Sequence, residues 1–173
     1  MSENRNGILI IQTGGTIDKR YPRTHLGYAF EIEGPAVQRI ISRAKVPYSV
    51  EFVTACRKDS QYINQEERQR ILESCKQSIH KKILITHGTD TMTETGAFLT
   101  EHHLDKTVVL TGAFLPEAFK DSDADFNVGF AIGALQVLDK HGVFIVMNGQ
   151  INESNKITRN EENFFLLINN SLY

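Results

Sequence analysis

The 173-residue sequence lacks several features that would place it in a class at once. It has no tryptophan, and its two cysteines, Cys56 and Cys75, are too few for a disulfide scaffold and lack the spacing of metal ligands. We expect both to be reduced thiols. No apolar run approaches the roughly 20 residues of a membrane-spanning helix, and the first residues lack the apolar core of a secretory signal. These absences predict a cytoplasmic protein with no membrane segment.

The sequence also lacks a charge of one dominant sign. Nineteen Lys and Arg stand against 21 Asp and Glu, which gives a net charge of -2. A nucleic-acid-binding protein normally has a basic excess, so we expect no nucleic-acid partner. Apolar residues make up 40% and charged residues 23%, a composition that supports a buried core. At this length we expect residues 1–173 to form a single domain.

Five short apolar segments occur at regular intervals and are predicted to be strands. Most are continuous apolar runs rather than alternating patterns, which is typical of central strands in a parallel sheet covered on both faces. The predicted strands are Ile8–Ile11, Tyr48–Val53, Ile83–Ile85, Val108–Leu110 and Val143–Met147.

Helical patterns fill the intervals between the predicted strands. The first begins at Gly34-Pro35, with proline at a plausible first helical position. A second begins with a capping box formed by Asn64 and Glu67. Two more are expected over residues 93–103 and 125–138. The order βαβαβαβαβ predicts a doubly wound α/β fold, with a mostly parallel sheet between two layers of helices in one three-layer domain.

Four predicted strands end in a polar residue followed by glycine. In open parallel sheets, ligands bind beyond the carboxyl ends of the strands, and glycine lets the backbone approach a ligand closely. For any single loop a plain turn is the simpler interpretation, whereas four together favour a binding site. The four steps are Thr13-Gly14, His87-Gly88, Thr111-Gly112 and Asn148-Gly149.

The segment Thr13–Ile17 reads TGGTI and is neither a Walker A loop nor a dinucleotide-binding GxGxxG motif. A hydroxyl such as that of Thr16 on a glycine-rich turn suits an exposed nucleophile, provided that a base lies close to it. The residues that follow, Asp18–Arg23, are polar and are expected to form a mobile loop.

A second hydroxyl-rich segment, Thr86–Thr95, lies where the third apolar strand turns into a helix. Either Asp90 or Thr91 would cap that helix, and its N-terminus would favour a bound carboxylate. We interpret His87, beside the strand end, as a structural hydrogen-bonding residue rather than a catalytic base.

Together the two segments resemble the signature motifs of bacterial-type L-asparaginases, TGGTI at residues 13–17 and HGTDTM at residues 87–92. The resemblance covers about residues 7–160, in the family's order and spacing. Further agreement lies at Asp59-Ser60-Gln61, Leu110–Ala113, Phe126-Asn127 and Val146–Asn148.

The resemblance implies an α/β domain that hydrolyses L-asparagine to L-aspartate and ammonia through an acyl-enzyme, without metal or cofactor, and uses L-glutamine slowly at most. Thr16 matches the nucleophile, while Thr89 and Asp90 match the residues that serve proton transfer. Tyr21 is our choice for the family's loop tyrosine, with Tyr28 as the alternative. The residues that the resemblance implies for substrate binding are Gly15, Asp59, Ser60, Gln61, Gly88, Thr89, Asp90 and Ala113.

The sequence departs from the family in length. The usual member has a carboxyl-terminal domain that lends an acidic residue to a neighbouring subunit, whereas these 173 residues resemble a rarer short-chain form. On family grounds we expect a homo-oligomer, either a dimer or a tetramer. The apolar run Phe164–Ile168 is expected to form a sixth strand of the sheet or to pack on a partner subunit.

The second departure is chemical. The family's lysine that pairs with the acid matching Asp90 falls on Arg159 here, and arginine does not give up its proton near neutral pH. The substitution leaves three interpretations open. Arg159 acts as an electrostatic clamp, Lys156 supplies the amine instead, or the protein has weak or no activity. The alternative function is therefore a non-catalytic domain that binds an amino acid as a sensor or assembly subunit. A flavodoxin-like nucleotide binder fits the fold but lacks a phosphate-binding motif.

Overall fold

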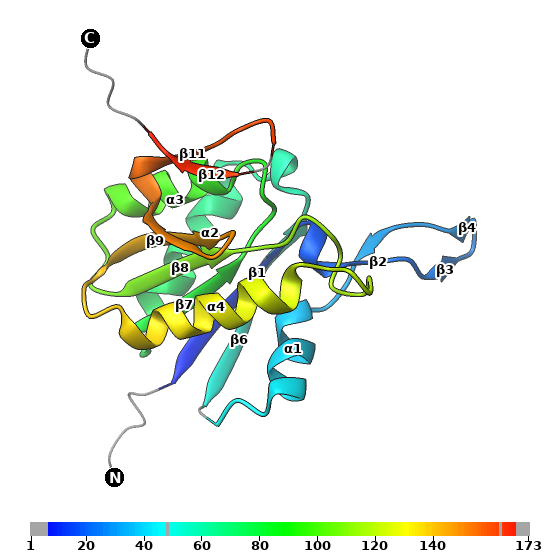
Figure 1. Ribbon diagram of the computed structural model, residues 1–173, viewed down its shortest axis with the longest axis horizontal. Helices are drawn as coiled ribbons and strands as arrows, with labels where there is room; N and C mark the ends of the chain where they lie inside the picture. Colours follow the sequence, from blue (N-terminus) through cyan, green and yellow to red (C-terminus); the bar gives the residue numbers. More distant parts are fainter. Residues whose placement is uncertain (1–6, 48, 163, 169–173) are drawn as a thin grey trace.

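In the computed structural model, which describes residues 7–47, 49–162 and 164–168, one sheet lies between two layers of helices (Figure 1). Its strands are β1 (Ile8–Gly14), β6 (Val50–Lys58), β7 (Lys82–Thr86), β8 (Thr107–Thr111), β9 (Gly142–Met147) and β10 (Gln150–Glu153). They are ordered β10-β9-β8-β7-β1-β6, and every neighbouring pair is parallel except β9 and β10. The predicted α/β fold with a mostly parallel sheet is confirmed.

Helices cover both faces of this sheet (Figure 1). They are α1 (Ala36–Ala44), α2 (Gln65–Gln77), α3 (Met92–Glu101) and α4 (Ala124–Val137). α1 and α4 pack on one face, and α2 and α3 pack on the other. The last two helices lie within one or two residues of their predicted bounds.

The strand residues alternate between two hydrophobic clusters. In β1, Ile8 and Ile10 pack beneath α1 and α4, whereas Leu9 and Ile11 pack beneath α2 and α3. Because both faces of the strand are buried, its sequence is continuously apolar. No helix among the described residues is long and apolar enough to cross a membrane.

The helix starts show two ways of satisfying exposed backbone N–H groups. The Asn64 side chain accepts from the backbone N–H groups of Glu66 and Glu67, and the Glu67 carboxylate accepts from the N–H of Asn64, so the predicted capping box is confirmed. α1 begins one residue later than expected, with Pro35 as its N-cap. Proline has no polar side chain, so this helix needs an acceptor from elsewhere.

The step Asn148-Gly149 forms a tight turn between two strands of the sheet, unlike the other three polar-glycine steps. Asn148 has φ 54° and Gly149 has φ 71°, and the residues on either side, Met147 and Gln150, pair across the turn. Two central residues with positive φ define the tight turn of a β-hairpin. The turn folds β10 back onto β9 at the sheet edge.

The expectation that Phe164–Ile168 completes the main sheet is wrong. Residues Phe165–Leu167 form β12, which pairs with β11 (Ile157–Arg159) in a separate two-stranded sheet. The edge beside β9 is already occupied by β10, which directly follows it in the chain. The Phe165 side chain is 1% exposed and packs in the cluster on the α2 and α3 face.

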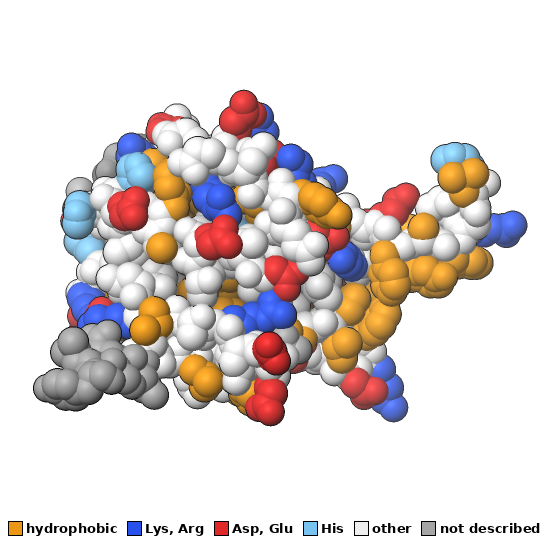
Figure 2. Space-filling view, turned by 90° about the horizontal axis from the view of Figure 1, so that it is seen from above, with side chains coloured by type: hydrophobic (Ala, Val, Ile, Leu, Met, Phe, Trp, Pro, Cys, Tyr) orange, Lys and Arg blue, Asp and Glu red, His pale blue; other side chains and the backbone are white. Residues whose placement is uncertain are grey.

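Residues 19–33 form an arm that projects from the body of the molecule (Figure 1). Its strands are β2 (Lys19–Arg20), β3 (Arg23–Thr24), β4 (Gly27–Tyr28) and β5 (Glu31–Ile32), paired as β2 with β5 and β3 with β4. Figure 2 shows hydrophobic side chains along one side of this arm. The predicted strand Tyr48–Val53 begins at residue 48, outside the described residues, and its described part runs on to Lys58.

Candidate active site

Three of the glycine-rich loops interlock at the carboxyl ends of β1, β7 and β8. A Cβ atom on Gly15 would lie 2.4 Å from the Cα atom of Gly88, and Gly15 also has φ 82°. A Cβ atom on Gly112 would lie 2.3 Å from the carbonyl oxygen of His87. Glycine is therefore required at both positions for space, and at Gly15 also for conformation, and the loops meet as the sequence predicted.

Thr16 begins a short 3-10 helix, η1 (Thr16–Asp18), directly after Gly15. It is partly exposed, whereas Ile17 and Asp18 behind it are buried. The side chain of Thr16 is thus the accessible one of this turn. Its neighbour Gly15 contacts the loop that carries Thr89 and Asp90.

Arg159 reaches from β11 to the loop between β7 and α3. Its Nη1 atom donates to the Thr89 hydroxyl at 3.2 Å and to Oδ1 of Asp90. The Gln61 amide donates to Oδ2 of Asp90 at 2.8 Å. The hydrogen bond from Arg159, and then the one from Gln61, hold the pKa of Asp90 below its ordinary value. Asp90 is therefore a carboxylate at neutral pH.

The alternative cation, Lys156, has a different partner. Its Nζ atom lies 2.7 Å from Oε2 of Glu153, in the same short helix region η3 (Ser154–Lys156). The guanidinium of Arg159, by contrast, forms an ion pair with Asp90, and it lies 5.9 Å from the ring centre of Phe114. The structure thus brings Arg159, and not Lys156, to the acid.

Ser60 lies beside the start of α3, as expected for a carboxylate site. It opens the short 3-10 helix η2 (Ser60–Tyr62) and is buried. The N-cap of α3, Thr91, donates its hydroxyl to the Ser60 carbonyl at 2.8 Å and its backbone N–H to the Ser60 hydroxyl at 3.4 Å. A Cβ atom on Gly88 would lie 2.7 Å from the same hydroxyl oxygen.

Asp59 forms an ion pair with a residue that the sequence analysis did not single out. The Nζ atom of Lys19 lies 2.7 Å from Oδ1 of Asp59, and its positive charge also acts on Asp90. The only sequence signal for this contact is a cationic residue three positions after Thr16.

Both candidate tyrosines lie in one aromatic cluster on the arm. The rings of Tyr21 and Tyr28 stack with centroids 5.7 Å apart, and Phe30 lies 4.9 Å from Tyr21. Both tyrosines are more than half exposed. The role of Tyr21 stays a prediction, and Tyr28 stacks beside it in the same cluster.

The loop after β8 is fixed by side chains from the start of α4. Asn127 donates to the Gly112 carbonyl at 3.0 Å and to Asp123 at 2.8 Å, and Asp123 accepts from the backbone N–H of Phe114. Ala113, between these anchors, is 1% exposed. It lies at the sheet edge where the other loops meet.

His87 is fully buried, with both ring nitrogens in hydrogen bonds. Nδ1 lies 2.7 Å from the carbonyl oxygen of Gly88, and Nε2 lies 2.9 Å from the hydroxyl of Thr95. Since the carbonyl only accepts, Nδ1 carries the proton and Nε2 accepts from Thr95. Burial lowers the pKa of His87 to about 4. The predicted structural role is confirmed, because the neutral ring holds Gly88 in place.

The expectation that Asp18 belongs to a mobile polar loop is wrong. Its side chain is 0% exposed and accepts hydrogen bonds from the backbone of Ala36 and from Gln12. Cys56 and Cys75 are both free cysteines, and burial raises the pKa of Cys56 to about 11 and of Cys75 to about 12. Within the described ranges, no three His, Cys, Asp or Glu side chains gather closely enough to hold a metal ion.

Residues 7–167 match the family described as asparaginase, N-terminal. The chain belongs to this family. The glutaminase-asparaginase of Acinetobacter glutaminasificans is 26% identical over 165 residues, which cover 90% of this chain and 50% of the relative. The L-asparaginase 2 of Escherichia coli (strain K12) is 38% identical over 79 residues, 44% of this chain and 23% of the relative. This asparaginase-family chain thus spans about half the length of the first of these relatives.

Solved structures agree with the family fold. A protein described as a probable cytoplasmic L-asparaginase, from Campylobacter jejuni, has a TM-score of 0.72 and 26% identity, with coverage of 88% of this chain and 48% of that chain. The thermostable L-asparaginase from Thermococcus kodakarensis has a TM-score of 0.77 over 94% of this chain and 51% of that chain, at 24% identity. The asparaginase-family chain therefore has the fold of half of each of these proteins.

Proposed function

We propose that this asparaginase-family domain hydrolyses the side-chain amide of L-asparagine to L-aspartate and ammonia. The observation that carries the proposal is the contact between Gly15 and Gly88, which places the turn of Thr16 against the loop of Thr89 and Asp90. Thr16 directly follows Gly15, and Thr89 and Asp90 directly follow Gly88, so the three proposed catalytic residues come from two segments in contact. The names of the relatives, L-asparaginase and glutaminase-asparaginase, support the same reaction class.

In the proposed reaction, the Thr16 oxygen attacks the amide carbon and forms a C–O bond. The hydroxyl proton passes towards Thr89 and Asp90 and then to the amide nitrogen, the C–N bond breaks, and ammonia leaves. Water then hydrolyses the ester at Thr16 and releases L-aspartate. Tyr21 of the arm is the proposed partner of the Thr16 hydroxyl.

The charges of the site suit a zwitterionic substrate. Asp90 is held ionised by Arg159 and Gln61 and would bind the α-ammonium group. The Ser60 hydroxyl and the N-terminus of α3 would bind the α-carboxylate. L-Glutamine has one methylene more than the pocket is proposed to fit, and this difference is typically worth about 1–3 kcal/mol. We therefore expect it to be a slower substrate.

Arg159 is proposed to act as an electrostatic clamp. Its guanidinium joins Thr89 to Asp90 and stays charged throughout the reaction, so it orients these two residues without exchanging a proton. If proton exchange at this position limits the rate, Arg159→Lys raises turnover.

Ammonia release from L-asparagine tests the proposal. We expect activity in the wild type, a loss of about 10³-fold or more in kcat for Thr16→Ala, and unchanged activity for Ser74→Ala, a control hydroxyl residue on α2. Full activity in Thr16→Ala would exclude it as the nucleophile. Activity in Arg159→Lys but not in the wild type would show that the wild-type site is intact except for the amine of the family's lysine.

The alternative function is a non-catalytic amino-acid sensor or assembly subunit, motivated by Arg159. It predicts no ammonia release from wild type or Arg159→Lys, together with a raised melting temperature in L-aspartate or L-asparagine.

We further propose a cytoplasmic homo-oligomer, a dimer or a tetramer. The location is supported by the C. jejuni neighbour's description, although a relative from Haemophilus influenzae is described as periplasmic.

A further inference from the structure

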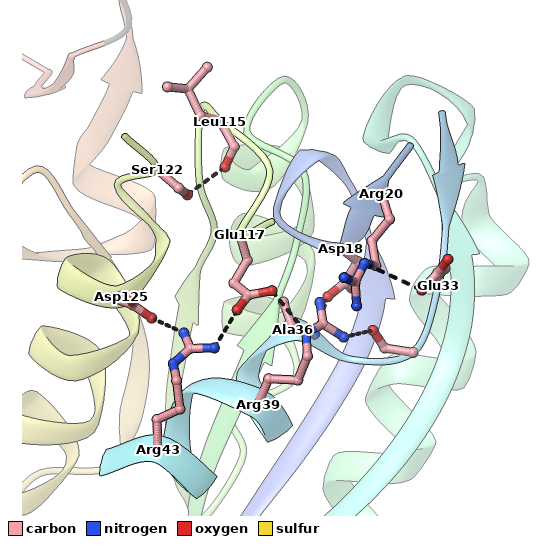
Figure 3. Close-up of polar contacts among 11 residues, drawn as sticks. Asp18, Arg20, Glu33, Ala36, Arg39, Arg43, Leu115, Glu117, Ser122 and Asp125 are labelled. Carbon is pink, nitrogen blue, oxygen red and sulfur yellow. Dashed lines mark hydrogen bonds and ion pairs between the residues drawn. The ribbon is translucent and has the colours of Figure 1, made fainter. Parts of the chain in front are cut away.

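A buried carboxylate lies two residues after Thr16, between β1 and the start of α1 (Figure 3). Oδ1 of Asp18 accepts from the backbone N–H of Ala36 at 2.7 Å. Ala36 is the first residue of α1, and its N-cap, Pro35, has no side chain that could accept this bond. Asp18 therefore caps a helix that begins 18 residues further along the chain.

The same residue closes the base of the arm. The backbone carbonyl of Asp18 accepts from the N–H of Glu33 at 3.1 Å. The Nε2 atom of Gln12 donates to Oδ2 of Asp18 at 2.9 Å and to the carbonyl of Glu33 at 2.7 Å. The two ends of the arm are thus fastened to each other and to β1 through one amide group.

The direction of these hydrogen bonds is fixed. The Oε1 atom of Gln12 accepts from the Thr54 hydroxyl at 3.0 Å, while its two N–H groups go to Asp18 and Glu33. Oδ2 of Asp18 must then act as an acceptor. A protonated carboxyl or an amide with its N–H groups at that position would place one donor against another.

A second anchor holds the turn from the opposite side. The carbonyl of Ile17 accepts from the backbone N–H of Glu117 at 3.1 Å. The Glu117 carboxylate accepts from Arg39 at 2.8 Å and from Arg43 at 2.7 Å, both on α1 (Figure 3). Helix α1 thus holds Ile17 through Glu117, and it holds Asp18 directly. Thr16 immediately precedes these two residues in the chain.

We propose that Asp18 is a positioning residue for Thr16, whose carboxylate ties the nucleophile's turn, the start of α1 and both ends of the arm into one unit. This inference rests on the proposed amidase function. Loss of the carboxylate loosens the turn at Thr16 and lets the arm move independently of it. Because small displacements of a nucleophile slow the chemical step, kcat falls more than KM changes.

The charged groups around Asp18 give the proposal a pH dependence. Arg39 on α1 and Arg57 on β6 act on its carboxylate, Arg20 and Glu33 pair at the base of the arm, and Glu117 lies behind Arg39. Burial nevertheless raises the pKa of Asp18 to about 6. Asp18 is ionised at pH 7.5. As the pH falls below 6 it gains a proton, and a protonated carboxyl faces the N–H group of Gln12 with a second donor.

The first test measures kcat and KM for L-asparagine between pH 5 and pH 8. We expect kcat of the wild type to fall on the acid side with a midpoint near pH 6. For Asp18→Asn we expect kcat to be at least tenfold lower at pH 7.5 and not to fall between pH 7 and pH 5. KM should change less than threefold. The exposed control Asp139→Asn should match the wild type. Full kcat in Asp18→Asn, or an unchanged acid limb, would overturn the proposal.

Hydrogen exchange at pH 7.5 provides a readout that does not depend on turnover. We expect the amides of Lys19, Glu33 and Ala36 to lose at least tenfold protection in Asp18→Asn, while amides of β8 keep theirs. If Asp18→Asn does not fold, Gln12→Met removes the shared donor and is measured instead. If the wild type releases no ammonia, the proposed function fails, and exchange alone decides: unchanged protection would overturn the role of Asp18.

Discussion

His87 and Asp18 are both fully buried, and burial moves their pKa values in opposite directions because it disfavours the charged form of each. The histidine is consequently neutral at pH 7, whereas the aspartate carries its charge. Asp18 has a folded-state pKa of about 6, above its unfolded value, so its protonation stabilises the folded state as the pH falls from 6 towards 4. Its expected effects on stability and on activity in acid thus have opposite signs.

Protonation of His87 is expected to destabilise the protein. Its folded-state pKa of about 4 lies below the unfolded value of 6.5, so the unfolded state binds the proton more readily between these pH values. The contribution of His87 to the free energy of unfolding then falls as the pH drops from 6.5 to 4, by up to about 3 kcal/mol. Urea unfolding of the wild type and His87→Gln at four pH values measures this.

The His87→Gln variant should lose less stability in acid than the wild type over that range, whatever its stability at pH 7.5. His102→Gln, which removes an exposed histidine at the end of α3, serves as the control and should follow the wild-type slope. Parallel slopes for wild type and His87→Gln would contradict the assignment.

At the scale of elements, glycine has two different roles in this chain. Gly129 lies inside α4, where an added Cβ atom would meet nothing within 4 Å. Gly149 lies in the turn between β9 and β10 with φ 71°. The same substitution is therefore expected to have opposite effects on stability at the two positions.

Gly129→Ala should raise the free energy of unfolding by roughly 0.5–1 kcal/mol, because alanine loses less backbone entropy in a helix. Gly149→Ala should lower it by about 1–2 kcal/mol, because a side chain disfavours positive φ. Urea unfolding of both variants beside the wild type measures the difference. A neutral Gly149→Ala would argue against the tight turn described above.

The sequence predicts some elements better than others for physical reasons. Central strands such as β7 and β8 are buried on both faces, so their apolar runs identify them. The sequence does not predict the second half of β6, because it lies at the sheet edge and residues 54–58 contain no large apolar side chain. The dipeptide Asn148-Gly149 carries the strongest short hairpin signal, and the structure forms a hairpin there.

The candidate site was predictable only where motifs carry it. Thr16, Thr89 and Asp90 lie in signature segments, and Arg159 is located by its position after the strand that ends at Met147-Asn148. The burial of Asp18 and the ion pair of Lys19 with Asp59 arise from tertiary contacts between distant segments. No local pattern in the sequence encodes such contacts.

At the scale of the whole molecule, exposed hydrophobic side chains gather on the arm and in and beside β12, and others are exposed singly elsewhere. In and beside β12, four apolar side chains are between 44% and 60% exposed: Phe164, Leu166, Leu167 and Ile168. An exposed apolar strand favours association with another chain. This agrees with the proposed homo-oligomer.

Sedimentation at micromolar concentration is expected to show a dimer or a larger assembly. Leu167→Ser should shift it towards the monomer, because Leu167 is 60% exposed and its replacement costs little in the isolated chain. Val137→Ser, at the end of α4, is the control with a similarly exposed side chain. A wild type that is monomeric at all concentrations would contradict the proposal.

The position of β1 between β7 and β6, two strands that follow it in the chain, has a consequence for biosynthesis. Its neighbours β6 and β7 both follow it in the chain, and β7 begins at Lys82, whereas β1 ends at Gly14. At about 5–20 residues per second, the ribosome needs several seconds to add the intervening segment. During that time Ile8–Ile11 has no partner strand on the β7 side, so a strand that is fully buried in the folded protein stays open to a holding chaperone.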